Sequence, residues 1–127
     1  MKFYVATAFA NKEQQREVAQ ALQGLGPGWH QTYDWTQNEA YRDEDHRREM
    51  AEADMCGVLT ADLLVVLLPG GPGTHCELGY ALASVARVVL WSWDGSHFES
   101  PTAPPFYHAP GVERVVGPVS DLVAYLR

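Results

Sequence analysis

A chain of 127 residues, 46% of them hydrophobic, is long enough for one domain with a single core, which we expect to span residues 1–127. Its formal net charge of −7 argues against nucleic-acid binding, because that affinity is mostly cationic in origin, and favours small molecules or proteins as partners. No apolar run approaches the roughly 20 residues that cross a bilayer, and the N-terminus lacks a signal-peptide layout, so we expect a cytoplasmic protein without membrane contact.

The first half of the sequence predicts two strand–helix units. Residues 3–8 form a short apolar run that predicts the first strand, and residues 11–25 predict a helix that Asn11 is suited to cap. Aromatic and β-branched residues at 29–35 indicate a second strand. A second helix is expected over residues 39–59, and the mixed charges of its first half are typical of a solvated face.

The central stretch is a six-residue apolar run, residues 63–68, which predicts a strand buried on both faces. Glycine and proline interrupt this run, and a helix is then expected from Thr74, with Glu77 in its first turn. Four residues share the apolar face of that helix: Leu78, Ala81, Leu82 and Val85. Because open α/β sheets bind ligands beyond the carboxyl ends of their strands, the glycine loop lies where a site is expected.

The last part of the chain predicts a strand at 88–93, a long irregular loop at 94–111, a strand at 113–116 and a helix at 119–126. Strands that alternate with helices imply right-handed βαβ units and a parallel sheet. We therefore predict a three-layer αβα fold with a five-stranded parallel sheet, of the Rossmann-like or flavodoxin-like type.

An acidic residue interrupts an apolar stripe on the helix expected over residues 39–59. Met50, Asp54 and Val58 are spaced four residues apart and share one side of that helix. A carboxylate there needs a partner or a proton, and burial would raise its pKa into the range useful for proton donation. The alternative is a structural acid that pairs with a neighbouring strand or faces solvent at the edge of the helix.

Glu77 admits two interpretations. With Thr74 it makes a T-x-x-E capping box, which is purely structural. Alternatively, a buried strand and a glycine loop bring Glu77 to a ligand, and the helix N-terminus would keep it ionised as a nucleophile. Two carboxylates at one sheet edge suit glycosidic-bond chemistry, in which one attacks or stabilises the anomeric carbon and the other protonates the leaving group.

Several motifs of other enzyme classes are missing. Residues 71–74 lack the Gly-Lys-Ser/Thr of a P-loop, and no G-x-G-x-x-G follows the first strand, which disfavours nucleoside-triphosphate hydrolysis and NAD oxidoreduction. No G-x-S-x-G nucleophile elbow is present. Cys56 and Cys76 form neither a CxxC pair nor a His/Cys ligand cluster, so no metal site is expected.

Three segments together resemble the nucleoside 2-deoxyribosyltransferase superfamily, which also contains 2′-deoxynucleoside 5′-phosphate N-hydrolases and cytidylate N-hydrolases. They are Phe3-Tyr4-Val5, Asp54 placed eight residues before the Asp62 that leads the apolar strand, and the G-x-x-x-E-L-G-x-A pattern of residues 73–81. This similarity extends to Trp93, and no match is found beyond it.

The resemblance implies an N-glycosidase-type enzyme. By this resemblance, Glu77 is the nucleophile that attacks C1′ of the sugar, Asp54 assists protonation of the leaving base, and Tyr4 positions Glu77. The implied reaction is hydrolysis or base exchange on a (deoxy)nucleoside or its 5′-monophosphate, without metal or organic cofactor, in a homodimer or larger homo-oligomer. We expect six residues to bind the substrate: Thr7, Ala8, Trp35, Gly71, Gly73 and Thr74.

The loop before Glu77 departs from the superfamily pattern. Residues 70–73 lack the serine typical of phosphate-specific hydrolases and the extra acidic residue typical of transferases. The sequence therefore leaves two questions open: whether the substrate is a nucleoside or a nucleotide, and whether the acceptor is water or a second base. A non-catalytic nucleotide-binding or interaction module on the same fold is an alternative, and cleavage of a larger N-glycoside such as NAD is another.

Overall fold

A parallel five-stranded sheet with the order β2-β1-β3-β4-β5 forms the centre of the structure, a computed structural model that describes residues 1–84 and 86–127. The strands are β1 (Lys2–Ala6), β2 (His30–Gln31), β3 (Leu63–Leu67), β4 (Arg87–Ser92) and β5 (Glu113–Val116). The helices are α1 (Lys12–Gln23), α2 (Glu44–Leu59), α3 (Pro72–Ala83), α4 (Ser96–Glu99) and α5 (Val119–Leu126). This strand order is the flavodoxin-like one, so the predicted three-layer fold is confirmed.

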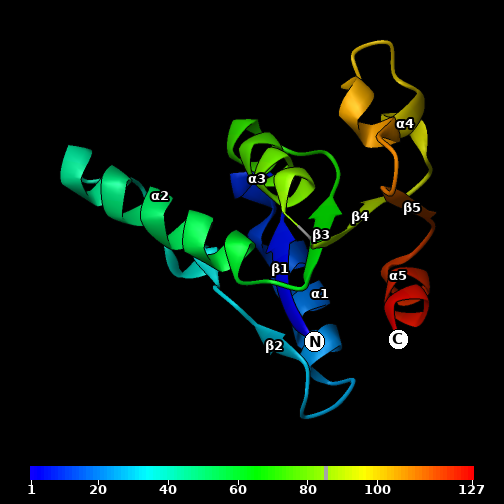
Figure 1. The fold of residues 1–127 in the computed structure, drawn as a ribbon, viewed down its shortest axis with the longest axis horizontal. Helices are drawn as coiled ribbons and strands as arrows, with labels where there is room; N and C mark the ends of the chain where they lie inside the picture. Colours follow the sequence, from blue (N-terminus) through cyan, green and yellow to red (C-terminus); the bar gives the residue numbers. More distant parts are fainter. Residues whose placement is uncertain (85) are drawn as a thin grey trace.

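The two faces of the sheet carry separate apolar clusters, because side chains alternate along each strand. One cluster contains Tyr4, Leu64 and Val66 of the sheet and lies beneath α2 and α3. The other contains strand residues of opposite parity and lies beneath α1 and α5. Figure 1 shows the sheet between these two layers of helices. Tyr4 therefore faces the two helices that carry Asp54 and Glu77.

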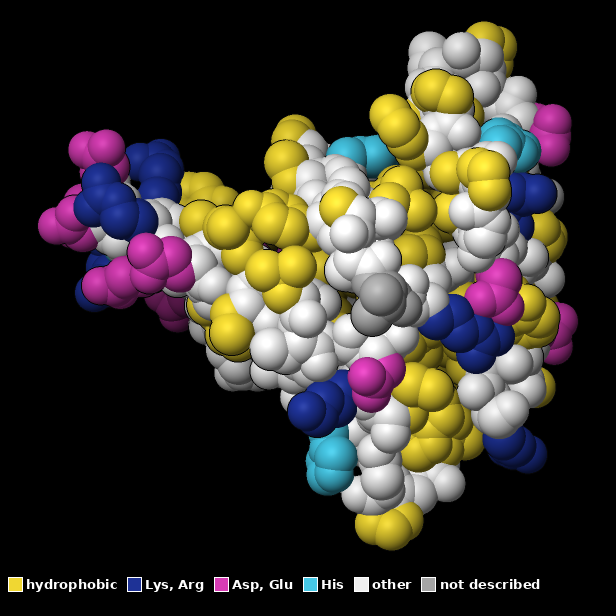
Figure 2. All heavy atoms as spheres, in the orientation of Figure 1, with side chains coloured by type: hydrophobic (Ala, Val, Ile, Leu, Met, Phe, Trp, Pro, Cys, Tyr) yellow, Lys and Arg dark blue, Asp and Glu magenta, His cyan; other side chains and the backbone are white. Residues whose placement is uncertain are grey.

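Helix α2 begins later than the sequence pattern suggests. The carboxylate of Asp43 accepts a hydrogen bond of 2.8 Å from the backbone N–H of His46, and this cap starts the helix at Glu44 and not at residue 39. The first half of α2 projects from the body of the protein (Figure 1). Figure 2 shows charges of both signs at this free end, as the pattern of a solvated face predicts.

Other element boundaries also differ from expectation. The second strand is only His30–Gln31, because Asp34 caps a short 3₁₀ helix that begins at Trp35. Helix α3 starts at Pro72, which places Glu77 in its second turn and not in its first. The expected loop at 94–111 contains α4 and a short 3₁₀ helix, Pro105–His108. Val85, predicted on the apolar face of α3, lies outside the described residues.

None of the helices among the described residues is long and apolar enough to span a membrane.

Candidate active site

Three side chains from three different elements converge on the α2/α3 side of the sheet. The hydroxyl of Tyr4 lies 3.3 Å from Oδ1 of Asp54 and also donates a hydrogen bond to Oε2 of Glu77. Tyr4 is fully buried, whereas both carboxylates are partly exposed. One phenol therefore bridges two acids that are distant in sequence, and its single proton can satisfy only one of them at a time.

Gly57 allows α2 to approach β1 closely enough for this contact. A Cβ atom at residue 57 would lie 2.8 Å from Cβ of Tyr33 and 2.9 Å from Cε2 of Tyr4. Sequence reasoning missed this residue. The signal was a glycine in the interior of a helix, where it costs stability unless the packing requires it.

Substitution of Gly57 by alanine is expected to destabilise the protein. Overpacking against Tyr4 and Tyr33 costs about 1–3 kcal/mol, more than the gain of up to about 1 kcal/mol in helix propensity. Gly79→Ala is the matched control, because Gly79 is also helical and a Cβ atom there meets no described atom within 4 Å. Urea unfolding should show a lower free energy of unfolding for Gly57→Ala and an equal or higher one for Gly79→Ala. Equal effects of the two substitutions would contradict this account of the packing.

The glycine loop after β3 fixes the start of α3. A Cβ atom on Gly70 would lie 2.7 Å from Cγ2 of Thr74, so a larger residue would collide with it. The hydroxyl of Thr74 accepts a hydrogen bond of 3.0 Å from the N–H of Gly71. Gly71 is the N-cap of α3 and Thr74 is the third residue of the helix, so the predicted capping box of Thr74 with Glu77 does not form in this structure.

Burial controls the protonation of the acid pair. It raises the pKa of Glu77 to about 8, which the hydrogen bond from Tyr4 opposes and the charge of Asp54 reinforces. Burial likewise raises the pKa of Asp54, against the hydrogen bond from Tyr4. The pKa of Tyr4 rises through burial and then through the two carboxylate charges. Burial therefore opposes the ionisation of Glu77 that the helix N-terminus was expected to favour.

A cavity of about 300 Å³ opens at the acid pair between α2 and α3. Its walls are small or apolar side chains of the two helices, Ala51, Met55, Gly73, Cys76 and Tyr80, with Asp54 and Glu77 among them. Figure 2 shows hydrophobic side chains gathered where the two helices meet. Apolar walls lower the local dielectric, which strengthens the interaction of both acids with a bound charge. The site thus offers two carboxyl groups, both with a raised pKa, to one ligand.

Of the residues expected to bind the substrate, only Gly73 lines this cavity. Thr7 and Trp35 are buried, and each donates a hydrogen bond of 2.8 Å to a backbone carbonyl, of Leu67 and Val5 respectively. Thr74 is buried and holds the glycine loop. The polar groups of these three residues already serve the fold, and their contact with a substrate stays a prediction. Ala8 and Gly71 lie close together beside the loop and stay predictions.

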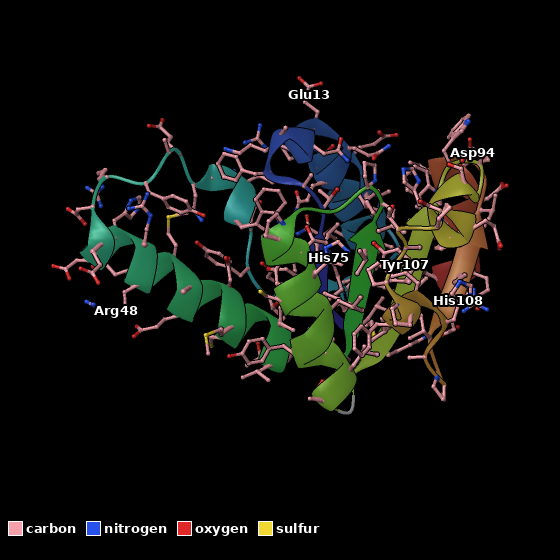
Figure 3. All side chains as sticks on the ribbon, turned by 90° about the horizontal axis from the view of Figure 1, so that it is seen from above. Glu13, Arg48, His75, Asp94, Tyr107 and His108 are labelled. Atoms are coloured by element: carbon pink, nitrogen blue, oxygen red, sulfur yellow. The ribbon has the colours of Figure 1, made fainter. Side chains whose placement is uncertain are left out.

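The other side of α3 is tied to the segment that follows β4. Nε2 of His75 lies 2.7 Å from the hydroxyl of Tyr107, and the two rings stack with centroids 5.7 Å apart (Figure 3). A cavity of about 530 Å³ beside His75 is larger than the one at the acid pair, but it has no carboxylate among its described lining residues. Within residues 1–84 and 86–127, no three His, Cys, Asp or Glu side chains group as a metal site would require.

Comparison with known proteins identifies the family. The model of the nucleoside 2-deoxyribosyltransferase family matches residues 3–115. The chain belongs to this family. The match extends past Trp93, where sequence reasoning found none, and it includes β5. A search of curated proteins finds no significant match.

Two solved structures share the family fold with this chain. A CMP N-glycosidase of Clostridium botulinum is 16% identical, with a TM-score of 0.65 over 99% of this chain and 98% of that one. A conserved protein from Enterococcus faecalis is 22% identical, with a TM-score of 0.68 over 98% of this chain and 95% of that one. At these identities the likeness shows the fold.

Proposed function

We propose that this member of the nucleoside 2-deoxyribosyltransferase family cleaves the N-glycosidic bond of a (deoxy)nucleoside or nucleoside 5′-monophosphate. Glu77 is the nucleophile and Asp54 the acid, and the glycosyl group passes to water or to a second base. The observation that carries the proposal is the single phenol, Tyr4, held between two partly buried carboxylates at one cavity. Family membership supports glycosyl transfer or cleavage as the reaction class, and the fold is shared with a CMP N-glycosidase.

The reaction needs an ionised Glu77 and a protonated Asp54, whereas burial raises the pKa of both groups and so favours the protonated form of each. Tyr4 lies between them and can exchange the proton. In this exchange the Tyr4 hydroxyl turns its proton toward Asp54 and accepts a hydrogen bond from the Glu77 carboxyl group. The Glu77 proton then passes to the Tyr4 oxygen while the phenolic proton passes to Asp54. This transfer leaves the charge of the cluster unchanged and prepares both groups in one step.

Bond cleavage then follows as a double displacement. A carboxylate oxygen of Glu77 attacks C1′, the bond from C1′ to the base nitrogen breaks, and its electron pair takes the proton from Asp54 as the base leaves. In the second step Asp54 accepts a proton from water, and the resulting oxygen nucleophile attacks C1′ and releases Glu77. A second base takes the place of water in a transfer reaction.

The pH dependence of kcat/KM is expected to be bell-shaped, with its alkaline limb near pH 8. The active pair carries one proton, and this proton is lost as the pH rises through the pKa of Glu77, which is about 8. On the acid side a second proton binds Asp54, and the rate falls below a pKa that burial has raised above the ordinary aspartate value. Initial rates of base release across this range measure both limbs. A rate that is constant from about pH 6 to pH 10 would contradict the shared-proton mechanism.

Base release from a substrate panel tests the proposed function. The panel contains ribo- and deoxynucleosides, their 5′-monophosphates and NAD, and free base is separated by chromatography. The proposal predicts product from at least one nucleoside or nucleotide. If substrates raise the melting temperature but release no base, the chain is a binding module and the proposal fails.

We also propose that the protein forms a homo-oligomer, because its sequence resembles a family whose members do so. Three apolar side chains on α2 and α3, close to the cavity, are 36–53% exposed: Met55, Leu59 and Tyr80. Burial of such side chains between copies of the chain would remove apolar surface from water.

A further inference from the structure

A second cavity, of about 340 Å³, lies between α1 and the edge strand β2. Its lining includes Gln15 and Ala19 of α1 and Gln31 of β2. Gln31 pairs in register with Phe3, whose side chain belongs to the cluster beneath α1. The cavity is therefore on the opposite side of the sheet from Tyr4 and the acid pair.

Two neutral amides in this cavity lack protein partners. Gln15 is 0% exposed, yet neither its Oε1 nor its Nε2 has a hydrogen-bond partner within residues 1–84 and 86–127. Nε2 of Gln31 is also buried without a described partner. The other buried residues of α1 are the apolar Val18, Ala19 and Leu22. An unpaired buried amide is costly, and an apolar residue would avoid that cost, so Gln15 is suited to a ligand and not to packing.

The charged groups at the rim of the cavity are already paired. Arg16 donates hydrogen bonds of 2.9 Å to both the hydroxyl and the backbone carbonyl of Thr36. Asp34 accepts from the backbone N–H of Thr36 at 3.0 Å and from the amide of Gln37 at 3.1 Å. Among the buried groups of the cavity, those without a described partner are therefore the neutral amides of Gln15 and Gln31.

We propose that this cavity binds a small, neutral, planar molecule with an amide or amidine edge, of which a free nucleobase is the example. Gln15 is closed to solvent in this structure, so binding requires neighbouring side chains at the rim to move aside. Its amide then offers an acceptor and a donor side by side, which complement such an edge. Gln31 supplies a further donor, and Ala19 an apolar contact for the ring. The volume lies at the small end of the range for ligand sites, about 300–1,000 Å³. The choice of a nucleobase within this class rests on the proposed function, which releases one.

An NMR titration of the ¹⁵N-labelled protein tests the site. Cytosine and adenine are the probes, and unsubstituted pyrimidine, which lacks the amide or amidine edge, is the control ligand. The side-chain amide signals of Gln15 and Gln31 are expected to shift saturably with at least one base and not with pyrimidine. Gln15→Met should weaken this binding at least about tenfold, whereas Gln20→Met, an exposed glutamine of the same cavity, should leave it unchanged.

The same titration in Glu77→Gln protein separates the two proposals. Saturable binding at the Gln15 amide in that variant supports the cavity even if the panel shows no turnover. Gln31→Met provides a second test if Gln15→Met does not fold. Amide signals that do not move, an equal response to pyrimidine, or binding unaffected by either glutamine variant would overturn the proposal.

Discussion

Replacement of Glu77 by glutamine is expected to lower kcat for base release by roughly 10⁴-fold or more, because the nucleophile is lost. The fold should remain intact. Glutamine has nearly the same shape and keeps an acceptor for Tyr4, and it removes a carboxyl group whose ionisation burial opposes. Initial rates from the most reactive substrate of the panel measure the loss, and thermal unfolding should give a melting temperature equal to or above that of the wild type.

The matched control is Glu52→Gln, which makes the same chemical change on an exposed position of α2. It should keep full activity. If Glu77→Gln also keeps full activity, Glu77 is not the nucleophile. A loss of activity with a lower melting temperature would show that Glu77 acts on the fold.

Replacement of Asp54 by asparagine is expected to lower base release by about 10²–10⁴-fold for ordinary bases, because asparagine cannot donate the proton that the leaving base needs. The loss should depend on the leaving group. A substrate whose base departs readily without a proton should lose much less activity than a natural nucleoside. Rates for a series of leaving groups of graded basicity measure this difference.

Asp45→Asn is the control for the Asp54 substitution. Asp45 lies on the same helix, is exposed and forms a surface ion pair with Arg48, which contributes little to stability. The Asp45→Asn substitution should leave the rate of base release unchanged with every substrate. Equal losses for good and poor leaving groups in Asp54→Asn would show that Asp54 is not the acid.

The sheet was predictable because its strands carry strong local signals. The apolar run at residues 63–68 and the short run at 113–116 predict strands without reference to the rest of the chain. The first forms β3 over Leu63–Leu67, and the second forms β5 over Glu113–Val116. The apolar spacing around Asp54 likewise indicated a side of α2 that faces the sheet, with Met50 and Val58 buried beside it. The first signal is a continuous apolar run and the second is a helical spacing, and both can be recognised in a single sequence.

Three features of the site were not predictable from such patterns. The contact of α2 with Tyr4 depends on Gly57, whose role appears only when two distant segments pack together. The pKa of Glu77 depends on its burial, and then on Tyr4 and Asp54, which come from β1 and α2. Thr7, Trp35 and Thr74 suited a ligand by residue type, but they bond to backbone groups of β3, β1 and the glycine loop, and the sequence does not show these pairings.

The most direct test of the account is to trap the covalent intermediate on Glu77. Turnover of the most reactive substrate is stopped with acid, and the protein is analysed by intact mass and by peptide mapping. We predict a mass increase of one glycosyl group, confined to the peptide that contains Glu77 and absent from Glu77→Gln. Release of base with an adduct on a different residue, or with no adduct under any quench time, would contradict the double displacement at Glu77.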